Sequence, residues 1–198
     1  RMNRAADGVV GQLRETAWHV DAFDALSHEW DVFSQPFSLI SHALYFEQKA
    51  IHRELLVDAL KGREIHIVGI GTARPDNPGV IMHDGMEWSE LSHFYCSARV
   101  NLNCTPWPRS CHHRVFQAAA SGAFMITDYC ADAPALFEPD KEMVYYRSFE
   151  ELPGLIDRYL GHPEEARTIA EAGRRRFLAH HTAEHRMAEL ARILGELL

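Results

Sequence analysis

Two arginines and two adjacent histidines gather in the segment 104–114, which runs Cys-Thr-Pro-Trp-Pro-Arg-Ser-Cys-His-His-Arg. A helix-forming run follows at about 112–121, so Arg114 falls in its first turn and Arg109 just before it. The first turn of a helix binds anions through its free backbone N–H groups and the positive end of its dipole. A positive side chain opposes that dipole unless an anion lies in front of it. We therefore expect an anion site here, against the alternative that both arginines are ordinary solvated side chains.

The elements around this segment alternate between strand and helix. Short alternating or apolar runs predict strands, and longer runs predict helices near 88–97 and 112–121. The strands are expected at 65–69, 80–82, 99–103, 123–127 and 143–146. Gly122 suits the C-terminal cap of the second helix. The order predicts an α/β fold with a parallel sheet and right-handed crossovers.

Both ends of the chain are predicted to be helical. Residues 1–60 are expected to form a helical N-terminal segment, and 61–198 the α/β domain with C-terminal helices. The last helices are bounded by Gly161, Pro163 and Thr182. The final one carries its apolar residues on one face: Met187, Leu190, Leu194 and Leu197.

Composition limits the classes of function. The 198 residues carry a net charge of -8, which argues against nucleic acid as a partner. The four cysteines form no CxxC pair, so we expect reduced thiols in a cytoplasmic protein. No apolar run approaches the roughly 20 residues of a membrane span, and no secretory leader is visible. His181 and His185 are spaced as metal ligands on a helix, but no third ligand accompanies them, and no metal site is expected.

Parallel sheets bind ligands in the crevice beyond the carboxyl ends of their strands. The segments that follow Gly69, Met82, Asn103 and Thr127 lie at those ends in the predicted order. The segment after Asn103 is the one that carries the two arginines. The fold and the charge pattern therefore indicate the same edge of the sheet.

The segment 114–128 resembles the R-V-F-E-A-x-A-x-G-x-x-x-x-T-D signature of the spore-maturation CgeB-like glycosyltransferases, of the GT-B group-1 superfamily. It runs Arg-Val-Phe-Gln-Ala-Ala-Ala-Ser-Gly-Ala-Phe-Met-Ile-Thr-Asp. Three flanking segments are similar to other motifs of that family, in the same order. They are 91–103, 136–146 and 180–186. The resemblance covers about 62–198, and 1–60 resembles more weakly a helical insertion found in related proteins.

The resemblance implies a Rossmann-like parallel sheet with helices on both faces, the donor-binding half of a GT-B enzyme. Its substrate would be a nucleotide-diphosphate sugar, bound without a metal or other cofactor. The acceptor would bind to an N-terminal domain that this chain does not contain. For related enzymes the sugar is transferred with retention of configuration.

The same resemblance assigns expected roles to single residues. Arg109, Arg114 and the helix start would stabilise the diphosphate, and the position of Gln117 would hold the ribose hydroxyls. Asn103 and Thr105 would face the diphosphate or the sugar. The segment 82–85, with His83 and Gly85, would recognise the base.

Two residues depart from the family pattern. Gln117 stands where the family has a glutamate, and a neutral amide accepts weaker hydrogen bonds than a carboxylate. Asp140 stands where a turn glycine is usual, although aspartate tolerates such turns. The sequence therefore leaves two functions open, a glycosyltransferase domain and a non-catalytic binding or assembly module that keeps the fold.

Overall fold

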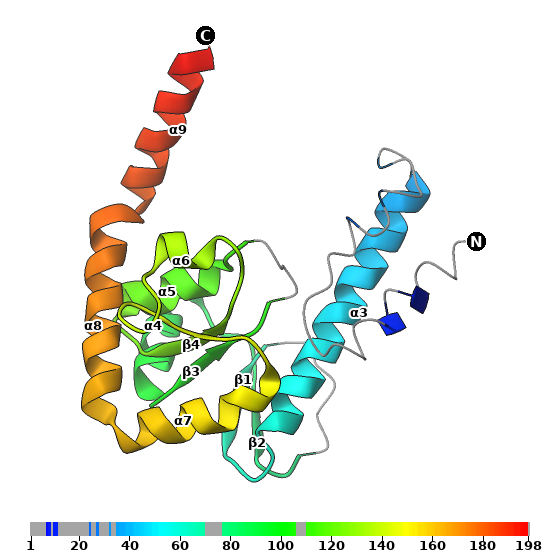
Figure 1. Cartoon of the computed structure of the whole chain (residues 1–198), viewed down its shortest axis with the longest axis vertical. Coiled ribbons are helices and arrows are strands. Elements are labelled where there is room, and N and C mark those ends of the chain that lie inside the picture. The colour runs from blue at the N-terminus through cyan, green and yellow to red at the C-terminus, as the bar shows by residue number, and fades with distance from the viewer. Residues whose placement is uncertain are drawn as a thin grey trace.

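The computed structural model describes residues 35–69, 77–105 and 110–197, with a few isolated positions between 7 and 32. The strands and helices that the sequence predicts for the α/β domain are present within these residues (Figure 1). In chain order they are α3 (Gln35–Ala59), β1 (Ile65–Val68), β2 (Val80–His83), α4 (Trp88–Ser97), β3 (Asn101–Asn103), α5 (His113–Ser121), β4 (Met125–Asp128), α6 (Ala133–Leu136), β5 (Val144–Tyr146), the 3-10 turn η1 (Phe149–Glu151), α7 (Leu152–Gly161), α8 (Pro163–His180) and α9 (Ala183–Leu197).

The described strands pair in parallel, as expected, and form two sheets. One contains β1 and β2, and the other has the order β3-β4-β5. In the second sheet Asn103 pairs with Thr127, and Asp128 pairs with Tyr146. The carboxyl ends of these three strands therefore lie at one edge. The α/β class with helices around parallel strands is confirmed.

The central strand β4 is buried along its whole length because both faces of the sheet are covered. Ile126 packs with Val144 and Tyr146 in one core, which α7 and α8 complete. Met125 packs on the opposite face with Val115 and other residues of α5. Alternate side chains on a strand point to opposite faces, so a continuous apolar run is the pattern of a strand covered on both sides.

Helix α3 packs against this body through its C-terminal half. Leu55, Leu56 and Leu60 contact the core, and the ring of His52 lies edge-on to Phe149 with centroids 5.8 Å apart. Most of the predicted helical segment before residue 35 lies outside the described residues. The division of the chain at residue 60 stays a prediction.

Two predicted turn positions have the expected left-handed backbone. Gly122 ends α5 with φ 75°, and its N–H bonds back to the last turn of the helix. Asp140 has φ 60°, the only positive value at a non-glycine residue among those described. Aspartate tolerates this conformation better than most residues, so the departure from glycine does not disturb the turn.

Helix α8 lies along α5 and approaches the chain closely at Gly173. A Cβ atom there would lie 2.5 Å from the carbonyl oxygen of Glu142. Helix α9 then projects away from the body (Figure 1). Its predicted apolar face is present but exposed, at Met187, Leu190 and Leu194. No described helix is long and apolar enough to cross a membrane.

Candidate functional site

The carboxyl ends of β3 and β4 are joined by a buried carboxylate. Asp128, the last residue of β4, accepts hydrogen bonds from the Asn103 side-chain amide at 3.1 Å and the Thr105 backbone N–H at 2.9 Å. The Asn103 amide also donates to the hydroxyl of Thr127 at 3.0 Å. These bonds fix where the chain leaves β3 and enters the arginine-bearing loop. Asn103 and Thr105 are each 1% exposed, so a contact with a ligand, as the sequence predicts, stays a prediction.

The start of α5 is organised by His112 and Arg114. His112 is the N-cap residue, and its Nδ1 accepts from the Arg114 backbone N–H at 3.2 Å and from Arg114 Nε at 3.1 Å. The guanidinium of Arg114 also donates to the carbonyl of Cys104 at 3.3 Å. Arg114 therefore spans the gap between the helix start and the end of β3, where the sequence predicted it.

His112 is neutral at physiological pH. Burial, followed by the positive charges of Arg114, His113, Lys49 and Arg53, lowers the pKa of its imidazole to about 3. Because Nδ1 accepts both hydrogen bonds from Arg114, the ring proton belongs on Nε2. A neutral imidazole caps the helix and orients Arg114 without adding a charge of its own.

Two further cations reach the same place from α3. The pKa of Lys49 is lowered by partial burial and by the charges of Arg53 and Arg114. The pKa of Arg53 is lowered by burial and by Arg114. Lys49, Arg53 and Arg114, which we term the cation cluster, are thus close enough to repel one another.

The cation cluster has no ion-pair partner among the residues that the structure describes. No described carboxylate lies within 4.0 Å of the Lys49, Arg53 or Arg114 charge, although the chain has a net charge of -8. Partly buried cations without counter-charges destabilise a fold. This arrangement is therefore suited to bind an anion.

Gln117 lies one turn along α5 from Arg114. Its side-chain oxygen accepts a hydrogen bond from the hydroxyl of Tyr95 at 3.4 Å, which leaves the amide N–H groups as donors. Gln117 also lines a surface groove of about 420 Å³. The other lining residues are Trp88, His113, Phe116, Ala120 and Phe177. Trp88, one of these lining residues, is 73% exposed, and its ring centroid is 6.3 Å from that of His113.

The remaining predicted site residues lie apart from this group or outside the description. His83 ends β2, its Nε2 lies 2.8 Å from Nδ1 of His66, and its ring is edge-on to Phe94. Gly85 follows in an exposed loop. Within the described parts of the chain, no hydrogen bond or ring contact joins His83 to Arg114 or Gln117. Arg109 lies outside the described residues.

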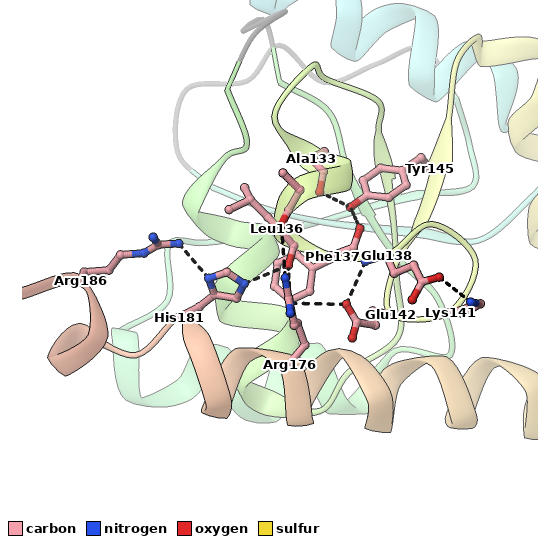
Figure 2. Close-up of polar contacts among 11 residues, drawn as sticks. Ala133, Leu136, Phe137, Glu138, Lys141, Glu142, Tyr145, Arg176, His181 and Arg186 are labelled. Carbon is pink, nitrogen blue, oxygen red and sulfur yellow. Dashed lines mark hydrogen bonds and ion pairs between the residues drawn. The ribbon is translucent and has the colours of Figure 1, made fainter. Parts of the chain in front are cut away.

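A second arginine-rich region lies where α8 meets α9 (Figure 2). Arg176 donates to the carbonyls of Leu136 and Ala135 at 3.1 and 3.3 Å, and lies 3.7 Å from a carboxylate oxygen of Glu142. His181 Nε2 is 2.9 Å from the Leu136 carbonyl, and its Nδ1 is 2.8 Å from Arg186. We term Arg176, His181 and Arg186, with these partners, the α8–α9 latch.

His181 and His185, which are spaced as metal ligands on a helix, make hydrogen bonds within the protein instead. Nε2 of His181 donates to a carbonyl and Nδ1 accepts from Arg186, while Nδ1 of His185 lies 2.7 Å from the Thr182 hydroxyl. In the described part of the chain, no three His, Cys, Asp or Glu side chains are grouped as metal ligands. The two histidines instead fix the start of α9.

Sequence reasoning missed Lys49 and Arg53. They are four residues apart on α3, a spacing that places both on one face of a helix. That spacing is a signal, but it does not tell which part of the fold the face meets. The structure supplies that information, because it brings the charges of Lys49 and Arg53 within electrostatic range of Arg114.

Comparison with known proteins gives one family and one fold. The sequence pattern of the family described as "Glycosyl transferase-like" matches residues 48–192. The structure is similar to a sucrose-phosphate synthase from Thermosynechococcus elongatus, with TM-score 0.61 and 20% identity, over 73% of this chain and 42% of that chain. The chain thus spans less than half of that structure, and at this identity the likeness concerns the fold. No curated protein sequence gives a significant match.

Proposed function

Since the chain belongs to the glycosyl transferase-like family, we propose that it binds a nucleotide-diphosphate sugar as the donor half of a glycosyltransferase. The observation that carries this proposal is the cation cluster. Three cations that lack carboxylate partners among the described residues gather at the start of α5, beside the carboxyl ends of β3 and β4. A diphosphate has the charge and the size to neutralise them.

The cluster would act on the leaving group of the transfer. When the bond between sugar and diphosphate breaks, negative charge grows on the departing phosphate oxygen. Fixed donors at that position stabilise the transition state more than the ground state. The guanidinium of Arg114 and the positive end of the α5 dipole supply such stabilisation, and Lys49 and Arg53 add positive charge from α3. We expect this stabilisation to need no metal ion.

Gln117 and the groove beside it would receive the nucleoside. The amide N–H groups of Gln117 can donate to a ribose hydroxyl because its oxygen already accepts from Tyr95. Trp88 offers an exposed aromatic face on which a base can stack. The segment with His83 and Gly85, which the family resemblance assigns to the base, precedes Trp88 on the chain.

We propose that the acceptor, a glycan, lipid or protein, binds to a second domain of the same enzyme, and that the enzyme works in the cytoplasm. Membership of the CgeB-like subfamily stays a prediction. The identity of the sugar and the stereochemistry of its transfer also stay predictions, and we expect retention.

One residue favours a second function, a binding module that has lost transfer activity. Gln117 replaces the family's acidic residue, and its hydrogen bonds to ribose hydroxyls are weaker than those of a carboxylate. Gln117→Glu tests this point. Tighter binding of a nucleoside diphosphate in the variant would favour the module, whereas weaker binding would indicate that the site is adapted to glutamine.

The proposal is tested by calorimetric titration of the chain with uridine, guanosine and thymidine diphosphates, with and without magnesium. We expect one of them to bind equally well in both conditions. Arg114→Ala should weaken this binding strongly. Gln117→Ala should reduce the preference for a ribonucleoside diphosphate over the corresponding deoxyribonucleoside diphosphate. Equal affinity of wild type and Arg114→Ala would overturn the assignment of the anion site.

A further inference from the structure

Two histidines on neighbouring strands contact one another on the β1–β2 sheet. His66 lies on β1, and His83 ends β2. The strands pair in parallel with Val68 opposite His83, so the two histidines lie on the same face of the sheet. Nδ1 of His66 lies 2.8 Å from Nε2 of His83, and the rings are stacked with centroids 5.0 Å apart. The fold therefore brings together two imidazoles that are 17 residues apart in the chain.

The contacts of this pair define which ring nitrogens carry protons. Nε2 of His66 lies 3.2 Å from a carboxylate oxygen of Glu64, and a carboxylate can only accept a hydrogen bond. Nε2 of His66 therefore carries the ring proton, and its Nδ1 accepts from Nε2 of His83. One proton thus lies between the two nitrogens. A metal ion can take its place when the proton of His83 moves to Nδ1 of the same ring.

The separation of the two nitrogens fits two ligands of one metal ion. Imidazole nitrogens bind divalent transition metals at about 2.0–2.1 Å. Two such nitrogens lie about 2.9 Å apart when the angle at the ion is 90°, and about 3.3 Å apart in a tetrahedron. The distance of 2.8 Å between His66 and His83 matches the first arrangement. Square-planar or tetragonal coordination by nitrogen and oxygen is typical of Cu²⁺ and Ni²⁺.

The surroundings of the pair support the same role. A metal-binding histidine commonly donates its other N–H to a carboxylate, which orients the ring. Glu64 is in this position toward His66. The ring of Phe94 lies edge-on to His83, with centroids 6.1 Å apart, and packs beside it. The side chain of His66 is 43% exposed, which leaves an ion a route of approach and room for water ligands.

We propose that His66 and His83 form a two-histidine site for a divalent transition-metal ion, Cu²⁺ or Ni²⁺, with water at its remaining positions. The sequence did not predict this site because the two histidines lie on separate strands. In the part of the chain that the structure describes, no three potential ligand side chains are grouped, so the protein supplies two ligands here. The site should therefore bind its ion reversibly and keep open coordination positions.

This site goes beyond the proposed donor binding and does not depend on it. Imidazole nitrogens suit transition metals, whereas Mg²⁺ prefers oxygen ligands. An ion held by His83 would lie beside the segment 82–85, which the family resemblance assigns to the base. An effect on nucleotide binding would rest on the proposed function, but the binding of the ion does not. The two can therefore fail independently.

The test is a titration of the full chain with Cu²⁺ in a buffer with excess glycine, which suppresses binding to single histidines. Wild type should bind one Cu²⁺ per chain, and pulsed electron paramagnetic resonance should detect two imidazole ligands. His66→Asn and His83→Asn should each lower the affinity at least about 10-fold, since even the loss of an outer partner commonly costs that much. Unchanged affinity in either variant, or a single imidazole ligand in wild type, would overturn the proposal.

A matched control and a second probe guard against general histidine binding and against a folding defect. His185→Asn alters the other pair with metal-ligand spacing, and its affinity for Cu²⁺ should stay within about twofold of wild type because distant sites act independently. In wild type, equimolar Cu²⁺ should protect His66 and His83 from diethyl pyrocarbonate and leave His185 reactive. An equal loss of affinity in His185→Asn, or no protection of His66 and His83, would contradict the two-histidine site.

The positioning role of Glu64 has its own readout. Glu64→Gln should lower the affinity for Cu²⁺ by less than either histidine change, because a neutral amide orients His66 but makes it a weaker ligand. Both imidazole ligands should remain in the resonance spectrum. Loss of one imidazole signal in Glu64→Gln would show that the carboxylate does more than orient the ring, and an affinity equal to wild type would remove Glu64 from the site.

Discussion

The cation cluster and the α8–α9 latch use the same residue types in opposite ways. In the latch Arg176 meets Glu142 and two carbonyls, and Arg186 meets Glu189 and His181. In the cluster the charges of Lys49, Arg53 and Arg114 repel one another, and no described carboxylate lies within 4.0 Å of them. Figure 2 shows the contacts of Arg176 with Leu136 and Glu142 and those of His181 with Leu136 and Arg186.

This difference separates a structural role from a binding role. Satisfied hydrogen bonds to charged groups stabilise a fold, whereas partly buried like charges cost free energy that a bound anion can offset. The latch should therefore affect stability and leave ligand affinity alone. Changes in the cation cluster should alter ligand affinity and leave the stability of the fold nearly unchanged. Substitutions in and around the two regions, followed by measurements of stability or affinity, can therefore separate the two roles.

The largest effect is expected when the cluster is given its own carboxylate. Arg53→Glu would place an acid beside Lys49 and Arg114, which relieves their repulsion and opposes an anionic ligand. We expect affinity for the preferred nucleoside diphosphate to fall at least about 100-fold, since a lost charged contact is worth about 1.5–3 kcal/mol and a repulsion is added. The melting temperature should not fall. Calorimetry and thermal denaturation measure the two.

Arg186→Glu is the matched control for this variant. It makes the same change in net charge but lies at the start of α9, in the latch. Its affinity should stay within about twofold of wild type, since distant exposed charges are screened by salt. An equal loss of affinity in both variants would show that net charge, rather than the cluster, governs binding.

A steric change in α8 should have the next largest effect. Gly173→Ala would push a methyl group to within 2.5 Å of the Glu142 carbonyl oxygen, so α8 must shift away from that loop. We expect the free energy of unfolding to fall by about 1–3 kcal/mol, as for other overpacked positions. Gly161→Ala is a control in the same part of the chain, since no atom lies within 4 Å of the added group. Comparable losses in both variants would argue against the close approach.

Removal of the latch arginine should destabilise the chain slightly less. Arg176→Ala leaves the Leu136 and Ala135 carbonyls without this donor and Glu142 without its cation. We expect the free energy of unfolding to fall by about 1–2 kcal/mol, with unchanged affinity for a nucleoside diphosphate. Urea denaturation gives the first quantity and calorimetry the second. A loss of affinity without a loss of stability would reverse the roles of the two regions.

The last expected effect is a pH dependence of stability that arises at His112, beside the cation cluster. His112 has a pKa lowered to about 3 in the folded chain, from an ordinary value of 6.5. Between these values the unfolded chain binds a proton that the folded chain does not, so stability falls as pH decreases through 6.5 toward 3. His112→Asn keeps a capping side chain but removes this titration. The variant should therefore lose less stability than wild type between pH 7.5 and 5. Identical slopes would mean that His112 does not have the lowered pKa.

The elements of the fold could largely be predicted from local patterns. The buried run before Asp128 predicted β4, Gly122 predicted the end of α5, and Pro163 predicted the start of α8. Each depends on burial or backbone geometry that a few neighbouring residues determine. The exposure of the α9 apolar face was not predictable, because periodicity shows which residues share a face but not what covers it.

The candidate site could be predicted only in part. Arg114 was identified because a helix start and a strand end are adjacent in sequence. Lys49 and Arg53 come from a helix more than fifty residues earlier, and only the packing of α3 brings them to Arg114. Arg109, predicted with Arg114, lies outside the described residues and stays a prediction.

The most direct test of the account compares Arg114→Ala with Arg176→Ala in one experiment. Both remove a partly buried arginine that bonds to backbone carbonyls, one from the cluster and one from the latch. Calorimetric titration with the nucleoside diphosphate that wild type prefers, without magnesium, should show affinity reduced about 10-fold to 100-fold in Arg114→Ala and unchanged in Arg176→Ala. Unchanged affinity in Arg114→Ala, or an equal loss in both variants, would contradict the claim that the cation cluster is the ligand site.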